Sequence, residues 1–494
     1  MPESQKEGII LHRDTVRTFP DTIPPLPFEL AGEKRLSDED IANKKEGWYV
    51  TGLPEAGVDP IRGFGLGANA FLYNNGSRQD PFFYYTPYRS SFSINISAFQ
   101  SGQVSGGLAG DFPYIFNSKW RLRFGLIFEQ DPNSQYYGIA AGNFNYRDKI
   151  LGQFVSNARF NDYYRNLAVI RPGRPHTGGQ ETGFRENPQA QYTDIHYNEY
   201  INEEYLGTVA VERAFFEGRL RVMIGYELLY VNIDTYDGKT VTGAIDPVTG
   251  AETTAINGRT KLTEDYEAQF APGMQSEWQR RNINGFGGGR MGLVQTGFMW
   301  DTRDLEPDPS SGIFAEYAQE ISSPLTGSQF NFSKHLVQFV FYKKVLPNRL
   351  SRAIFTGRFA VGGIRGSSIP ITELFDQWSS KEEGGIHAIG GPWSLRGYKE
   401  ARFVGNAIAF GNLELRTRIA QARILKQHLA FSAVPFLDYG NVIDYGRITD
   451  RLREMRYSPG LGGRIAWNQA TILRFDYAWS REDAQFFFVF GHTF

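Results

Sequence analysis

The chain has 494 residues, a formal net charge of −2 and no cysteine. A balanced charge gives no general attraction to nucleic acid, and the lack of cysteine excludes disulfides, cysteine-ligated metals and thiol catalysis. Aromatic residues make up 15% of the chain and glycine accounts for 54 residues, a combination that favours an all-β protein over a helical one. No apolar run reaches the length of about 18 residues that a membrane-spanning helix needs.

Residues 1–60 lack the alternating pattern of the remaining chain. A proline-rich stretch at residues 19–27 precedes a charged stretch at residues 36–47, where Ser37 stands before three acidic residues and is expected to cap a short helix. So short a segment cannot bury a substantial core of its own. We therefore predict an N-terminal arm with a short helix over residues 1–60, followed by one β domain over residues 61–494.

From residue 63 onward, segments of about 9 to 12 residues alternate apolar side chains with small or polar ones, which is typical of transmembrane β-strands. Residues 92–98, 122–129, 222–230 and 473–480 show this alternation clearly. In a membrane barrel the apolar face contacts lipid and the other face lines the interior. We predict a sixteen-stranded antiparallel transmembrane β-barrel whose strands begin near Phe64, Phe92, Gly106, Trp120, Tyr136, Tyr205, Arg219, Met291, Ile313, Phe330, Arg349, Ala407, His428, Pro459, Thr471 and Gln485.

The connections between these predicted strands differ in length on the two sides. Three long connections, at residues 145–204, 237–290 and 367–406, follow the fifth, seventh and eleventh predicted strands and therefore lie on one side. The opposite connections are mostly short. Long loops on one side and tight turns on the other are typical of outer-membrane barrels.

The last predicted strand, residues 485–494, is rich in phenylalanine. Phe486, Phe488, Phe490 and Phe494 are expected to share one face. Such a strand must pair with the first strand if the barrel is to lose its open edges. Phe490 and Phe494 also resemble the C-terminal signal that bacterial outer-membrane proteins present to their insertion machinery.

The glycine- and proline-rich stretch at residues 390–400 reads as a shaped loop with Arg396 at its centre. A guanidinium has five N–H donors, so a functional arginine needs acceptors nearby. Glu414 and Asp438 lie in later strand segments, on the face that carries the polar residues, and a carboxylate cannot face lipid cheaply. We expect Arg396 to reach Asp438 first and Glu414 second; a solvated loop arginine is the alternative.

Several of these segments together resemble the BamA/TamA (bacterial surface antigen) superfamily of outer-membrane barrels. Residues 411–416 and 436–440 look like two of its strands, and residues 301–312 look like its turn between strands eight and nine. The resemblance implies that the sixth outer loop folds into the lumen and that its arginine contacts acidic residues of the wall. The matching loop residues are Leu395, Arg396, Gly397 and Tyr398, and the matching turn residues are Asp301, Arg303, Asp304 and Gly312. We interpret the turn residues as a device that pins neighbouring strands.

The resemblance implies a location in the bacterial outer membrane and a role in insertion, assembly or translocation of polypeptides, with lipid as a further possible substrate class. Relatives usually carry periplasmic POTRA modules, and residues 1–60 are too short for one, so partner proteins are expected to replace that function. A passive pore or a structural subunit of an envelope complex is the alternative. We predict no catalytic residue, no cofactor and no metal site, because the seven histidines are scattered.

Overall fold

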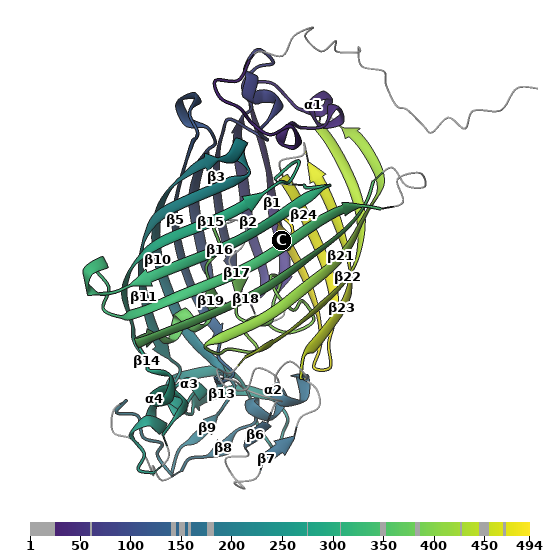
Figure 1. Cartoon of the computed structure of the whole chain (residues 1–494). Coiled ribbons are helices and arrows are strands. Elements are labelled where there is room, and N and C mark those ends of the chain that lie inside the picture. Colours follow the sequence, from purple (N-terminus) through teal and green to yellow (C-terminus); the bar gives the residue numbers. More distant parts are fainter. Residues whose placement is uncertain are drawn as a thin grey trace, which may run out of the picture.

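The structure is a computed structural model in which one large antiparallel sheet wraps around a central space (Figure 1). It describes residues 25–59, 62–139, 145–147, 154–156, 160–174, 182–273, 275–306, 308–345, 352–380, 386–424, 427–443, 454–467 and 471–494. The first 24 residues of the predicted arm lie outside this described part. Within the described ranges, no helix is both long and apolar enough to cross a membrane.

Successive strands of the sheet pair in antiparallel order along the chain. These strands are β1 (Trp48–Asp59), β2 (Gly63–Asn74), β3 (Ser90–Phe99), β4 (Val104–Phe112), β5 (Trp120–Gln135), β10 (Glu199–Phe215), β11 (Leu220–Thr235), β15 (Gly288–Asp301), β16 (Gly312–Ser322), β17 (Asn331–Lys344), β18 (Ala353–Pro370), β21 (Ala407–Ile424), β22 (Gln427–Val442), β23 (Arg456–Trp467), β24 (Thr471–Trp479) and β25 (Ala484–Phe490). The short β14 (Ile283–Asn284) adds a parallel ladder to β18 and brings the sheet to 17 strands. Because the described part shows no ladder between β1 and β25, closure into a sixteen-stranded barrel stays a prediction.

Two strand assignments from the sequence differ from the structure. The strand predicted near Tyr136 is wrong, because β5 runs on to Gln135 through a polar stretch that looked like a turn. The sheet also begins earlier than expected: β1 occupies residues 48–59, within the predicted arm, and pairs with β2 along its whole length. Gly52, Pro54 and Gly57 obscured its alternation, and proline is tolerated there because β1 forms a ladder on only one side within the described residues.

The first two long connections lie together at one end of the sheet, opposite α1, and the third folds inside the sheet (Figure 1). The parallel pairing of β9 (Gln191–Thr193) with β13 (Glu252–Asn257) joins the first two connections into one small four-stranded sheet. The other elements of these connections are β6 (Asn145–Arg147), β7 (Phe154–Ser156), α2 (Phe160–Ala168), β8 (Arg171–Pro172), β12 (Thr240–Ile245), α3 (Lys261–Glu267), η5 (Ala268–Phe270), α4 (Glu277–Arg281), η7 (Ile371–Leu374), β19 (Asp376–Gln377) and β20 (Ile386–His387).

The described arm residues lie against the opposite end, where the turns are short (Figure 1). Here α1 (Asp38–Asn43) begins after Ser37, whose hydroxyl accepts a hydrogen bond from the Asp40 backbone N–H. Lys34 forms an ion pair with Asp301 at 3.3 Å. An apolar cluster holds the arm further; it consists of Leu36, Ile41, Phe83, Tyr84 and Leu305. The short 3-10 turns at this end are η1 (Gly32–Lys34), η2 (Pro81–Tyr84), η3 (Ile115–Asn117) and η4 (Phe216–Gly218), while η6 (Pro324–Thr326) lies at the other end.

The two faces of the sheet have opposite character. Large apolar side chains such as Leu126, Ile224 and Val361 are exposed on the outward face. Charged side chains on the same strands, including Arg123 and Arg358, are buried on the inward face. An exposed apolar wall around a charged interior is the arrangement of a membrane barrel.

Candidate functional site

A rigid loop carries the arginine motif into the interior of the sheet. Gly390 and Gly391 both have positive φ, 116° and 92°, and a Cβ on Gly390 would lie 2.1 Å from the Lys399 carbonyl oxygen. The Gly391 N–H donates to the Tyr398 carbonyl at 3.0 Å, and the Gly390 N–H donates to Ser394 Oγ at 2.9 Å. The loop therefore closes on itself, and these hydrogen bonds hold the backbone on both sides of Arg396.

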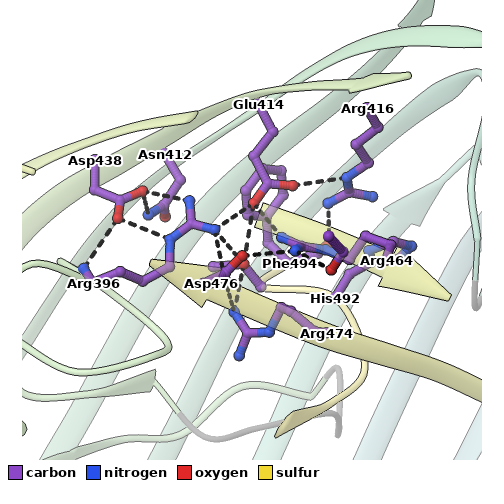
Figure 2. A network of polar contacts seen from close by, with 12 residues as sticks. Arg396, Asn412, Glu414, Arg416, Asp438, Arg464, Arg474, Asp476, His492 and Phe494 are labelled. Carbon is purple, nitrogen blue, oxygen red and sulfur yellow. Dashed lines mark hydrogen bonds and ion pairs between the residues drawn. The ribbon is translucent and has the colours of Figure 1, made fainter. Parts of the chain in front are cut away.

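Arg396 is completely buried and contacts three carboxylates (Figure 2). Its Nε and Nη2 donate to the two oxygens of Asp438 at 2.9 and 2.7 Å, and its backbone N–H donates to the same carboxylate at 3.0 Å. Nη1 donates to Glu414 at 2.7 Å and to Asp476 at 3.0 Å. The structure thus places Arg396 in a bidentate pair with Asp438 on β22 and in a single contact with Glu414 on β21.

The other residues of the loop motif fit the same pocket. A Cβ on Gly397 would lie 2.3 Å from the Trp479 carbonyl oxygen, so only glycine allows this approach to β24. The Gly397 N–H donates to Ser458 Oγ on β23. Leu395 and Tyr398 are buried in an apolar cluster under the loop, together with Ile389, Phe403, Ile408 and Phe410.

Further charged residues that the sequence did not single out complete this network, which we call the arginine cluster (Figure 2). Asp476 on β24 also accepts from Arg464 at 2.7 Å, and Glu414 accepts from Arg416 at 2.8 Å. Arg474 Nη1 donates to Thr493 Oγ1 at 2.6 Å. The inward alternation of Arg474 and Asp476 was visible in the sequence, but nothing there told which strands would face the loop. The cluster comprises Arg396, Glu414, Arg416, Asp438, Arg464, Arg474 and Asp476.

The charges in the cluster explain why Arg396 stays ionised. Burial alone lowers the pKa of a guanidinium, but the carboxylates of Asp438, Asp476 and Glu414 outweigh this and raise the pKa of Arg396 well above its ordinary value. The ring of Phe436 lies under the guanidinium, 3.4 Å from its centre. An always-charged, planar donor fork held on all sides is suited to pinning a loop, and it offers no proton for acid–base chemistry.

The chain end also enters this cluster. Gly491 has a φ of 82° and its N–H makes the last sheet bond, to Ile472, after which the chain turns inward. The expectation that Phe494 shares a face with Phe486 is therefore wrong: Phe486 is 49% exposed, whereas Phe494 is 4% exposed and packs inside the sheet. Tyr342 OH donates to the Phe494 carbonyl at 3.2 Å.

Phe490 is the last residue of β25, but its side chain lies outside the described part. The idea that Phe490 and Phe494 act as an insertion signal stays a prediction.

The predicted turn residues are brought together between β15 and β16. Asp301 accepts from the Arg303 backbone N–H at 2.9 Å and forms a bidentate pair with its guanidinium at 3.0 and 2.9 Å. Asp304 accepts from the Ser310 backbone N–H at 2.8 Å. Gly312 has a φ of 107°, and a Cβ there would lie 2.3 Å from a carbonyl oxygen of the turn. These contacts are those of a structural turn.

A second buried ionic group holds the same long connection to β16 and β17, which lie on the other side of β18 from the cluster strands. Lys334 on β17 forms ion pairs with Glu320 at 2.6 Å, with Glu373 at 2.6 Å and with Asp376 at 2.9 Å. The three carboxylates lie close enough together to ligate a cation, but the Lys334 ammonium already supplies the positive charge. The connection from β18 to β21 is therefore fixed to β16 and β17 at one end and to β21, β22 and β24 at the other.

An apolar outer wall, a charged interior and an arginine loop folded inside together define an outer-membrane β-barrel protein. Residues 62–494 match the Omp85 superfamily domain, and the chain belongs to this superfamily. This confirms the resemblance to BamA/TamA-type barrels and the location in the bacterial outer membrane. Residues 26–89 match a domain of unknown function (DUF5982), and this range includes the described arm, β1 and β2.

One curated protein and several solved structures are similar to the chain. The outer membrane protein assembly factor BamA of Nitratidesulfovibrio vulgaris is 26% identical over 200 residues, which is 38% of this chain and only 23% of that protein. Among solved structures, BamA from Haemophilus ducreyi lacking POTRA domains 1–3 has a TM-score of 0.46 at 12% identity, covering 90% of this chain and 70% of that one. CdiB from Escherichia coli has a TM-score of 0.45 at 8% identity, covering 90% and 62%.

Proposed function

We propose that this chain inserts or translocates polypeptides at the outer membrane through the seam between β1 and β25. The observation that carries the proposal is the state of these two strands. Within the described residues, β1 pairs only with β2, and β25 pairs only with β24. The similarity to a BamA assembly factor supports the same direction.

Within the described part of the chain, the seam offers a backbone edge without a ladder partner on each side. An edge strand presents N–H and C=O groups that another strand can pair with, which is how β-augmentation recruits a peptide. The edges differ in length, because β1 runs over residues 48–59 and β25 only over residues 484–490. A substrate strand that pairs with β1 would therefore find more backbone partners there than on β25.

Described side chains join the two sides of the seam at the end near Thr51. Thr51 on β1 and Thr471 on β24 bring their hydroxyl oxygens to 3.0 Å, and both residues are buried. This contact forms where β25 has already left the sheet, since the last residue of β25 faces Leu473. At this end Tyr73 OH also lies 3.4 Å from Thr471 Oγ1, and Lys45 Nζ donates to Gln427 Oε1 at 2.8 Å. At about 1 kcal/mol for each such hydrogen bond, opening the seam at this point costs a few kcal/mol.

The arginine cluster stabilises the wall on the β25 side of the seam. Arg396 contacts carboxylates from β21, β22 and β24, and also Thr493 in the segment after β25 at 3.1 Å. Of these strands, β24 pairs with the seam strand β25, and β22 and β21 follow on the same side of the seam. We infer that the loop keeps this wall rigid while β1 moves, a positioning role that requires no catalysis.

Polypeptide substrate, surrounding lipid and at least one partner protein are the interactions this role requires. A passive pore is the alternative from a different class. The arm lies over the short-turn end, and buried ion pairs fix the long connection inside the sheet, which disfavours an open pore. Stable solute conductance of the full chain in planar bilayers would favour the pore instead.

A reversible crosslink across the seam tests the proposal. Because the chain contains no cysteine, the pair Thr51→Cys and Thr471→Cys introduces the only two thiols, at a hydroxyl separation of 3.0 Å. The matched control is Ser97→Cys with Ser105→Cys, whose hydroxyls lie 2.8 Å apart across the continuous β3–β4 ladder. Both pairs are expected to oxidise, but only the first joins strands that must separate.

The readout is the abundance of barrel proteins in the outer membrane of cells that depend on the variant. Under oxidising conditions the seam crosslink should lower the abundance of cargo proteins, as depletion of the chain does, and a reductant should restore it. Broad loss indicates general assembly, and loss of one protein indicates dedicated transport. Full function with a complete seam crosslink, or equal loss with the β3–β4 crosslink, would overturn the proposal.

A further inference from the structure

The outward wall contains a shallow apolar groove that the proposed function does not use. It has a volume of about 550 Å³ and lies over β4, β5, β10 and β11, which pair in this order in the sheet. Strand register explains the groove: Gly207 on β10 stands directly between Leu126 on β5 and Leu228 on β11. Both leucines are exposed, at 57% and 46%, so the missing side chain of Gly207 leaves a hollow between two apolar ridges.

The next row of outward-facing residues, two positions along each strand from Leu126, Gly207 and Leu228, marks the polar boundary of the membrane. Phe128, Tyr205, Tyr230 and Arg290 stand opposite one another across four successive strands. The rings of Tyr205 and Tyr230 lie 6.4 Å apart, and both residues are half exposed. Tyrosines concentrate at the level of lipid headgroups, where their rings are apolar and their hydroxyls are wet.

The next row beyond the tyrosines is polar. It contains Gln130, Glu203 and Asn232, which face one another across β5, β10 and β11. The Asn232 amide donates to Glu203 at 3.3 Å. The groove therefore opens at its outer end onto one exposed cation, Arg290, and one carboxylate, Glu203.

A loop segment borders the groove beyond Leu228. Thr326 Oγ1 donates to the Gly292 carbonyl at 2.6 Å, and Tyr226 OH donates to the Thr326 carbonyl at 2.9 Å. A Cβ on Gly292 would lie 1.9 Å from the Thr326 carbonyl oxygen, so η6 lies directly on the outward face. Leu325 at its tip is 99% exposed, which extends the apolar surface outward.

We propose that this groove binds one acyl chain of a glycerophospholipid whose phosphate contacts Arg290. The wall faces lipid, and the groove lining is almost wholly apolar from Gly106 to Leu228. At roughly 30 Å³ for a water-sized group, 550 Å³ accommodates about eighteen methylene-sized groups, the scale of one acyl chain. Arg290 supplies the charge for a phosphate, and Glu203 suits the amine of a zwitterionic headgroup.

Shape and headgroup contacts carry the selectivity, because the hydrophobic effect does not distinguish the groove from neighbouring lipid. The groove lies on β4, β5, β10 and β11, well separated in the sheet from the strands that carry the arginine cluster. Lipid binding in the groove does not depend on opening of the seam. A failure of one experiment therefore leaves the other standing.

Filling the groove tests the inference directly. A Cβ on Gly207 would meet its nearest neighbour, Leu126 Cδ2, at an ordinary 3.5 Å, so Gly207→Leu is expected to fold. The matched control is Gly463→Leu on the outward face of β23, where a Cβ would have nothing within 4 Å. Both variants add a leucine to the outer wall, but only the first fills the groove.

The full-length protein and both variants are extracted in a mild detergent, and phospholipids retained per chain are counted by native mass spectrometry. Filling the groove should deprive the acyl chain of about ten close carbon contacts. The Gly207→Leu variant should therefore retain roughly tenfold less phospholipid than the wild type, and the Gly463→Leu control should retain as much as the wild type. Arg290→Gln should lower retention roughly threefold and remove any preference for phosphate-bearing lipids. Equal retention by the wild type and Gly207→Leu, equal loss in the control, or retention of lipid A alone would overturn the proposal.

Discussion

Replacing Arg396 by alanine is expected to destabilise the barrel strongly. Most of the lost stability should come from the buried Asp438 carboxylate, which loses its cation. Asp438 loses its bidentate partner and keeps two neutral donors, the backbone N–H of residue 396 at 3.0 Å and the Asn412 amide at 2.7 Å. Glu414 and Asp476 retain Arg464 as a partner. Removing one partner of a fully buried ion pair costs about 3–5 kcal/mol, because the remaining charge is left without compensation.

Two further variants separate this charge effect from the cavity that alanine leaves. Arg396→Lys keeps the charge but loses the planar fork, so it should fall between wild type and alanine. Adding Asp438→Asn to Arg396→Ala removes the uncompensated charge and should recover about 1–3 kcal/mol. If the cavity alone were responsible, the second change would recover nothing.

Urea unfolding of the barrel in detergent micelles, followed by heat-modifiable gel mobility and tryptophan fluorescence, measures these differences. Arg402→Ala is the matched control, because Arg402 lies in the same connection, is equally buried and pairs with Glu482 near solvent. Its loss should cost about 1–2 kcal/mol. A destabilisation by Arg396→Ala no larger than that of Arg402→Ala would refute this account of the cluster.

Three further changes test other parts of the structure. Burial lowers the pKa of His492 from 6.5 to about 3, so the unfolded chain binds more protons between these values. The contribution of neutral His492 to the free energy of unfolding is complete above pH 6.5 and falls by about 1.4 kcal/mol per pH unit below it. His492→Asn should therefore make the urea midpoints less dependent on pH between about pH 7 and 5. Gly312→Ala forces a Cβ against the Thr302 carbonyl oxygen at 2.3 Å and should cost about 1–3 kcal/mol, whereas unchanged midpoints would contradict a strained turn. Lys334→Met leaves the carboxylates of Glu320 and Glu373 without their cation and should lower the free energy of unfolding by about 3–5 kcal/mol. If these carboxylates take up protons instead, the urea midpoint of the variant will rise more steeply than that of the wild type as the pH is lowered.

The sequence by itself determined the class of fold and the centre of the site. Alternation of apolar and polar residues predicted strands with a lipid face and a charged face, because side chains of a strand point to opposite sides in turn. The same alternation placed Glu414 and Asp438 inward, and the glycines around Arg396 predicted a shaped loop. These features are local, so a single stretch of sequence contains the information.

Only the tertiary structure decided which residues meet across strands. Asp476 joins Arg396, and Gly207 falls between Leu126 and Leu228, because strand register brings together residues far apart in the chain. Phe494 turns inward because Gly491 leaves the sheet, which alternation cannot predict. Register depends on all neighbouring strands at once, and a shift of one residue would turn every side chain to the other face.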